Sequence, residues 1–150
     1  MDAETQFKIL IQILEKKKAA LEVILNVSEN QEALLESPPD EARASMFKAM
    51  SDEKQKHIDE ILHLDNVFQT GFDPLRQEIE DNPKKWRKYL VDMQIMIDDV
   101  LELDVKIRAQ ETKNRTIITE QMPHIKQPKP VISEAAKREL LHLYKQNSKK

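Results

Sequence analysis

Apolar residues recur at every seventh position after residue 85, at Trp86, Met93, Val100 and Ile107. A second apolar row runs beside the first, at Tyr89 or Leu90, Met96 or Ile97, and Leu103. A seam that repeats every 3.5 residues is removed from water only when another helix lies along it. The pattern therefore predicts one long helix over residues 83–121 that packs lengthwise against other helices.

The N-terminal part of the chain has the same kind of pattern. One seven-residue row contains Phe7, Leu14, Leu21 and Leu35, and Ser28 interrupts it. The neighbouring positions are filled by Leu10, Ile11, Ile24 and Leu25. This amphipathic periodicity predicts a helix over residues 2–36.

A third apolar stripe predicts a helix over residues 40–81. Its members are Phe47, Met50, Ile58, Ile61, Leu64, Phe68, Phe72, Leu75 and Ile79. Gly71 and Pro74 interrupt this helix, because a proline removes one backbone donor and clashes with the carbonyl four residues earlier, at Thr70. We therefore expect a kink near residues 71–74.

Capping residues mark the predicted boundaries. Ser37 is expected to cap the second helix, with Pro38 at its first position and Asp40 completing the capping pattern. Asn82 and Pro83 are expected to start the third helix in the same way. The short connection at 37–40 makes the first two helices antiparallel neighbours.

The three stripes together predict an all-α fold, an elongated antiparallel three-helix bundle or coiled coil over residues 1–122. Pro123, Pro128 and Pro130 predict an extended linker, which Ser133 ends by capping a short helix. The apolar side of that helix holds Ala136, Leu140, Leu143 and Tyr144, with Leu141 beside them. Because a helix of about 13 residues is marginal in water, we expect residues 123–150 to be mobile unless they meet a surface.

Composition removes several classes of function. Of the 150 residues, 39% are hydrophobic, one is glycine and none is cysteine. This leaves no material for phosphate-binding loops, nucleophile elbows or thiolate chemistry, so we expect neither an enzyme nor a cofactor. No apolar run reaches the roughly 18 residues that a membrane span needs, and the N-terminus carries acids where a signal peptide carries bases. We therefore expect a cytoplasmic protein without membrane insertion.

Charge is divided unevenly along the chain. Residues 123–150 hold seven Lys or Arg against two Glu, so of the net charge of −3 the remaining residues 1–122 carry −8. An acidic body lacks the clustered cations that neutralise phosphates, which argues against a nucleic-acid partner. The run Lys16-Lys17-Lys18 and the acids between Asp92 and Asp104 are both interpreted as solvated helix faces.

Two short motifs match the spacing of di-metal helical bundles. Glu60 with His63, and Glu139 with His142, each place a carboxylate and an imidazole one helical turn apart. Such a site also needs an inward Glu from each of two other helices, and the second motif follows the proline-rich linker. A di-metal bundle therefore stays only as an alternative, and no metal is expected.

Asn114 falls in the apolar row that begins at Trp86, with Gln110 and Glu111 beside it. A buried asparagine at such a position fixes the register between helices. The other interpretation is that the bundle frays here and Asn114 meets water. The sequence leaves both open.

Residues 64–115 resemble flagellar export chaperones of the FlgN type. The second helix of that family ends in a Leu-Asp-x-x-Phe-like step, matched here by Leu64, Asp65 and Phe68. The third helix carries a pattern matched here by Gln94, Ile97, Ile107, Glu111 and Asn114. Gly71 and Pro74 depart from the uninterrupted second helix of the family.

The resemblance implies a non-catalytic cytoplasmic chaperone that binds terminal segments of flagellar hook-filament junction subunits and delivers them to the type III export apparatus. Recognition would be helix-in-groove, with an amphipathic cargo helix covering an apolar stripe. Our candidate partner-binding residues are Val131, Ile132, Leu140, Leu141, Leu143 and Tyr144, which would contact cargo or shield the cargo groove. A generic coiled-coil adaptor, or an oligomerisation module that forms a homodimer, is the alternative.

Overall fold

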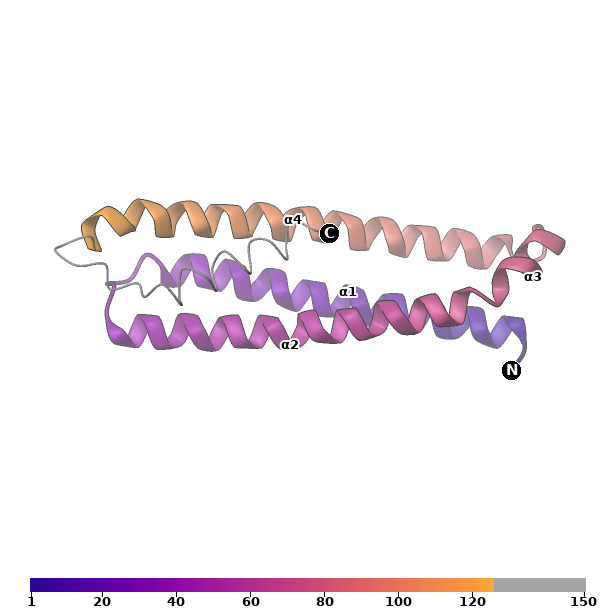
Figure 1. Cartoon of the computed structure of the whole chain (residues 1–150). Helices are drawn as coiled ribbons and strands as arrows, with labels where there is room; N and C mark the ends of the chain where they lie inside the picture. The colour runs from indigo at the N-terminus through magenta and orange to yellow at the C-terminus, as the bar shows by residue number, and fades with distance from the viewer. Residues whose placement is uncertain (126–150) are drawn as a thin grey trace. The chain divides into compact units, whose positions relative to one another are not determined.

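The computed structural model of the chain describes residues 1–125, and side chains through residue 122 (Figure 1). It has four helices and, within this range, no strand: α1 Ala3–Leu34, α2 Glu41–Phe72, α3 Leu75–Asp81 and α4 Arg87–Ile125. The predicted all-α class is confirmed. The chain divides into two units, Met1–Arg115 and residues from Thr116 onward, and the described part of the second unit is the end of α4.

Aspartates cap the first two helices. The side chain of Asp2 accepts a hydrogen bond from the Thr5 amide at the start of α1 (2.7 Å). Hydrogen bonds from the Thr5 side chain first and the Thr5 amide second lower the pKa of Asp2. Asp40 accepts one from the Arg43 amide at the start of α2 (2.8 Å). The predicted cap at Ser37 is wrong, because the Ser37 hydroxyl donates backward to the Leu34 carbonyl (2.6 Å). Asp40 is itself the cap, since it alone combines extended backbone with an oxygen that reaches the third helical amide.

The second predicted helix is interrupted at Asp73 and Pro74, where α2 ends and α3 begins. Gly71 lies inside α2 and has no positive φ, so it is not the hinge. Gly71 instead allows side chains of α1 to lie close to the α2 backbone. The Gln6 side chain donates to the Gly71 carbonyl (3.2 Å), and a Cβ at this position would lie 3.0 Å from Leu10 Cδ2. The proline, which cannot donate to the helix, is the physical cause of the break.

The predicted start of the third long helix at residue 83 is also wrong. Asn82 ends α3, where its amide donates to the Glu78 carbonyl (3.0 Å), and α4 begins at Arg87. The turn between them is held by Trp86, whose indole donates to Glu78 Oε1 (3.1 Å). Residues 83–86 thus form a turn that buries the Trp86 indole, and they do not form the first turn of α4.

Contacts between side chains give the helix directions. From α1 to α2 the partners run in opposite order, as in Lys17 with Asp65 and Gln31 with Ser51, so these helices are antiparallel (Figure 1). From α1 to α4 the partners run in the same order, as in Lys18 with Asp99 and Ser28 with Glu111, so these helices are parallel.

Two apolar clusters lie along α1. The first consists of Phe7, Leu10, Ile13, Leu14, Leu64, Leu75, Trp86 and Met93. The second consists of Ala20, Leu21, Ile24, Ile61 and Val100, with Ile58, Leu103 and Ile107 against it. Each cluster joins α1, α2 and residues of the Trp86 row, so the seven-residue rows of the sequence do form the core.

The lysine run of α1 is more than a solvated face. Lys17 Nζ lies 2.7 Å from Asp65 of α2, and Lys18 Nζ lies 3.2 Å from Asp99 of α4. Adjacent lysines point to different neighbours because successive residues on a helix are about 100° apart. Their ammonium groups thus lie at the two edges of the α1 seam.

Within residues 1–125, none of the helices combines the length and the apolar character that crossing a bilayer requires.

Candidate functional site

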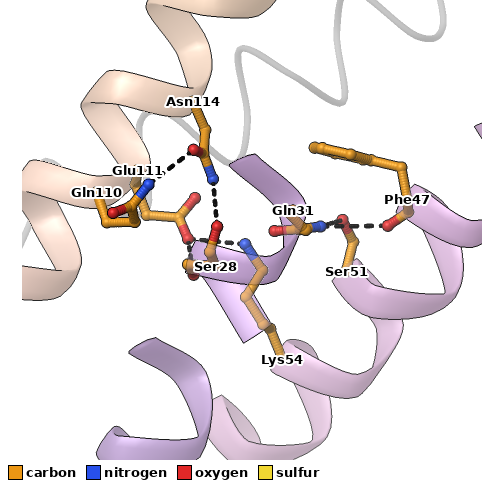
Figure 2. Close-up of polar contacts among 8 residues, drawn as sticks. All are labelled: Ser28, Gln31, Phe47, Ser51, Lys54, Gln110, Glu111 and Asn114. Carbon is orange, nitrogen blue, oxygen red and sulfur yellow. Dashed lines mark hydrogen bonds and ion pairs between the residues drawn. The ribbon is translucent and has the colours of Figure 1, made fainter. Parts of the chain in front are cut away.

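A layer of polar side chains follows the second apolar cluster along α1, and it is the feature of the fold least explained by packing alone (Figure 2). Ser28, Gln31 and Asn114 are as buried as the apolar core, at 0%, 0% and 3% exposure. Ser28 and Asn114 occupy the two seven-residue rows that carry Phe7 and Trp86. We define the polar layer as Ser28, Gln31, Ser51, Lys54, Gln110, Glu111 and Asn114.

Asn114 connects α4 to the backbone of α1. Its Nδ2 donates to the Ser28 carbonyl (2.9 Å), and its Oδ1 accepts from the Gln110 amide (3.0 Å). Of the two interpretations left open by the sequence, the structure shows the buried one. Because a buried asparagine in an apolar row favours the alignment in which its amide is hydrogen-bonded, Asn114 favours the register that places it beside Ser28.

Gln31 makes the corresponding connection between α1 and α2. Its Nε2 donates to Ser51 Oγ (2.9 Å) and to the Phe47 carbonyl (3.2 Å), as Figure 2 shows. Within the described part of the chain, its Oε1 is buried without a hydrogen-bond partner. An unpaired buried oxygen costs about 1–3 kcal/mol, so Gln31 fixes a position at the expense of stability.

Charge enters the layer through Lys54 and Glu111. Lys54 Nζ lies 2.7 Å from Glu111 Oε1, and the side chains are 12% and 28% exposed. The Ser28 hydroxyl donates to the same oxygen. This carboxylate therefore holds one residue from each of α1 and α2, and with Asn114 it makes the layer a contact among three helices.

Glu32 continues the network at the surface. It accepts from the Gln110 amide (2.8 Å) and lies 3.1 Å from Lys113 Nζ. These hydrogen bonds, from Gln110 first and Lys113 second, lower the pKa of Glu32. The Glu32 carboxylate thus joins α1 to two side chains of α4 at the edge of the layer.

An open groove lies beside this edge, between α1 and α4. Its lining is Leu25, Glu29, Lys106, Ala109, Gln110 and Lys113. It is shallow and mainly apolar, with lysine and glutamate stems around Leu25 and Ala109. A shape of this kind has neither the depth nor the convergent polar groups of a small-molecule site.

The candidate metal motif is not assembled in the described part of the chain. Glu60 and His63 are both exposed, and Glu139 and His142 lie outside the described residues. Through residue 122, no group of three or more His, Cys, Asp and Glu side chains is placed to share a metal ion. The one imidazole near the seam, His57, lies 3.7 Å from Glu60 and is partly buried.

The predicted partner-binding residues Val131, Ile132, Leu140, Leu141, Leu143 and Tyr144 also lie outside the described residues. Sequence reasoning found Asn114 and the break at Ser28 but missed Gln31, Ser51 and Lys54. Gln31 had a signal: it falls seven residues after Ile24, in the row that also contains the buried Leu10. A polar residue in such a row on one helix, matched by one on another, points to a polar layer.

The fold and the site together define an all-helical packing unit whose helices are joined by apolar clusters and one internal polar layer. When the chain is compared with protein families, curated proteins and solved structures, it matches none of them.

Proposed function

We propose that the chain is a non-catalytic cytoplasmic chaperone that binds amphipathic helical segments of flagellar hook-filament junction proteins for type III export. In this proposal α1, α2 and α4 form an antiparallel three-helix coiled coil, and residues 123–150 form a proline-rich linker with a short C-terminal helix. The observation that carries the proposal is the resemblance of residues 64–115 to chaperones of the FlgN type.

The environment of the resembling residues supports it. Leu64 is buried in the first apolar cluster and Phe68 packs against that cluster, while Asp65 pairs with Lys17. Glu111 and Asn114 both belong to the polar layer. The matching residues therefore lie where the helices contact one another. Such residues determine how the helices align, and alignment of helices is a property that members of one family share through their fold.

Cargo binding would be driven by the burial of an apolar stripe between the cargo helix and the chaperone. The groove at Leu25 and Ala109 offers one such surface on the helices. The apolar residues of the tail, from Val131 to Tyr144, would contact cargo or shield this kind of surface until cargo displaces them.

The test uses the full chain and a peptide from the terminal helix of a hook-filament junction subunit. Replacing Leu140, Leu143 and Tyr144 by Ser is expected to change the peptide affinity at least about tenfold in calorimetry, because each apolar contact removed contributes about 1 kcal/mol or more. Binding weakens if the tail contacts cargo, and it tightens if the tail shields the cargo groove. The matched control replaces Lys145 and Lys149 by Gln, which changes charge and leaves the apolar side intact. If the serine variant binds like the parent chain, the tail does not recognise cargo.

A generic adaptor or oligomerisation module is the second candidate. The adaptor form of this candidate is favoured by the exposed apolar side chains of α4, such as Leu101 and Val105, which another protein could cover. Sedimentation velocity separates the two: a homodimer or tetramer that persists without cargo supports the module, and a monomer supports the chaperone.

A further inference from the structure

α4 carries a second apolar stripe on the side away from its core row. Its members are exposed: Val91 49%, Ile95 55%, Leu101 57% and Val105 66%. Spacings of four, six and four residues keep them on one side of the helix, roughly opposite Met93 and Val100, which are buried. From Val91 to Val105 this side is about 21 Å long.

The same stretch is strongly acidic. Residues 91–105 contain five Asp or Glu and no Lys or Arg. Asp98 and Glu102 lie within the stripe itself, one turn apart: Asp98 falls between the two apolar pairs, and Glu102 falls within the second pair. The Asp98 carboxylate accepts a hydrogen bond from the Gln94 amide (2.9 Å), a neutral donor, whereas Glu102 pairs with Lys106 of the next turn.

Single exposed apolar residues are normal on protein surfaces and need no explanation. α2 provides the comparison, since it exposes Leu62 and Val67 at a spacing of five, which puts them on different sides of that helix. In α4 the exposed residues form two pairs at i and i+4, the spacing at which side chains on a helix touch. This regular spacing along one side of α4 is typical of a surface that binds another helix.

We propose that this face of α4, from Val91 to Val105, docks a cationic amphipathic helix of a partner protein. The partner helix has two apolar pairs about two turns apart and Lys or Arg between them, placed against Asp98 and Glu102. A second copy is the wrong occupant, because pairing this face with itself would set the Asp98 and Glu102 carboxylates of one copy against those of the other. The proposal shares with the proposed function only the helical form of the partner and does not involve the tail.

The experiment uses the full chain and a synthetic 18-residue helical peptide, fluorescein-labelled, with two Leu pairs at i and i+4 and Lys between them. The expected result is saturable binding by anisotropy that weakens as salt rises, because charge pairs at this surface are screened. Two further peptides, one with the same residues scrambled and one with Glu in place of Lys, are expected to bind at least about tenfold more weakly.

The decisive variant is Leu101→Gln with Val105→Gln, which leaves the core untouched. It is expected to lose about tenfold or more in affinity, corresponding to two apolar contacts. The matched control, Leu62→Gln with Val67→Gln on α2, is expected to stay within about twofold. Asp98→Asn with Glu102→Gln is expected to remove most of the salt dependence.

Equal binding by the Leu101/Val105 variant, or an equal loss in the α2 control, would overturn the proposal. So would a dimer of the parent chain that this variant dissociates, since a second copy would then be the occupant. The serine variant of Leu140, Leu143 and Tyr144 is expected to bind the peptide normally. If it alone loses binding, the α4 site is wrong while the proposed function of the tail stands.

Discussion

The aromatic end of α1 and the polar layer are equally buried and are held together by different forces. Phe7 is fully buried and contacts Trp86 and Tyr89, with ring centroids 5.0 and 5.5 Å away. Gln31 is just as buried but makes directed hydrogen bonds and leaves one oxygen unpaired. Apolar contacts are nondirectional and stabilise many registers, whereas a buried amide fits only one. The comparison assigns stability to the aromatic end and register to the polar layer.

The largest effect is expected from Phe7→Ala. Removing a fully buried ring between Trp86 and Tyr89 forfeits its transfer energy and leaves a cavity, which should lower the free energy of unfolding by about 3–5 kcal/mol. Urea unfolding followed by circular dichroism measures it. The matched control, Ile95→Ala on the exposed face, is expected to change stability by less than about 0.5 kcal/mol. A loss below about 1 kcal/mol for Phe7→Ala would contradict the role given to this end.

The next effect concerns the charged pair of the polar layer. Lys54→Met removes the cation beside Glu111, leaving a partly buried carboxylate with the Ser28 hydroxyl, and should cost about 1–3 kcal/mol of stability. Adding Glu111→Met should recover most of that loss, because both charges are then absent. The same urea titrations on the single and double variants give the coupling.

An exposed pair on α2 controls for charge alone. Lys48 and Asp52 lie 3.2 Å apart with side chains 78% and 63% exposed. Lys48→Met is expected to cost no more than about 0.5 kcal/mol, since solvent screens such pairs. If it costs as much as Lys54→Met, burial does not distinguish the polar layer from the surface.

A smaller effect, of different sign, is expected from Gln31→Leu. Leucine is similar in size to glutamine and removes the buried Oε1, which has no partner among the described residues. The Phe47 carbonyl, which loses the Gln31 donor, lies within α2, where the helix backbone supplies a donor. The free energy of unfolding should therefore be unchanged or rise by up to about 1 kcal/mol. The cost should appear as looser packing, seen as broader amide resonances and a lower urea m value. Ser51→Ala, which keeps Gln31 but removes its partner, is expected to destabilise by about 0.5–1.5 kcal/mol. A large loss with Gln31→Leu would mean that the layer contributes stability as well as register.

The two regions also differ in how far the sequence predicted them. Phe7, Leu14, Trp86 and Met93 repeat every seventh residue, and hydrophobic burial follows that period directly, so the core and the all-α class are confirmed. Gln31 and Lys54 read as surface residues because burial of a polar group depends on its partners from other helices. The pattern of one helix does not show which partners a polar residue finds on another helix. The only signals in the sequence are the polar residues that stand in apolar rows, at Ser28, Gln31 and Asn114.

The boundaries were missed for a related reason. Ser37 and Asp40 are both good caps, and the choice between them depends on where the backbone turns extended. Asn82 and Pro83 look like a helix start, but the buried Trp86 indole and its bond to Glu78 delay α4 to Arg87. Local capping preferences amount to about 1 kcal/mol, and burying an indole outweighs them.

The smallest effect lies at the rim of the aromatic end and is seen in titration rather than in stability. The Tyr89 hydroxyl donates to Glu4 Oε1 (2.9 Å). This hydrogen bond is the main reason that the pKa of Glu4 is lowered, with Lys8 as the next cause, and it raises the pKa of Tyr89. Tyr89→Phe keeps the ring stacked on Phe7 and removes only the hydroxyl. The pKa of Glu4 is therefore expected to rise toward its ordinary value, as measured by carboxyl ¹³C shifts.

The sign of the pH dependence follows from these directions. Because the pKa of Glu4 is lowered in the native state, Glu4 contributes stability above its unfolded-state pKa, and this contribution is lost as the pH falls through the native pKa. The difference in free energy of unfolding between the parent chain and Tyr89→Phe should therefore shrink on acidification. The raised pKa of Tyr89 acts on the alkaline side, where its contribution is lost as the pH rises through the native value. Lys8→Gln, the control, removes the hydrogen bond and the charge of Lys8, which are the second and third causes, and should also raise the pKa of Glu4 while the Tyr89 hydroxyl stays in place. An unchanged Glu4 titration in Tyr89→Phe would show that the aromatic end is held by ring packing alone, which would make its contrast with the polar layer complete.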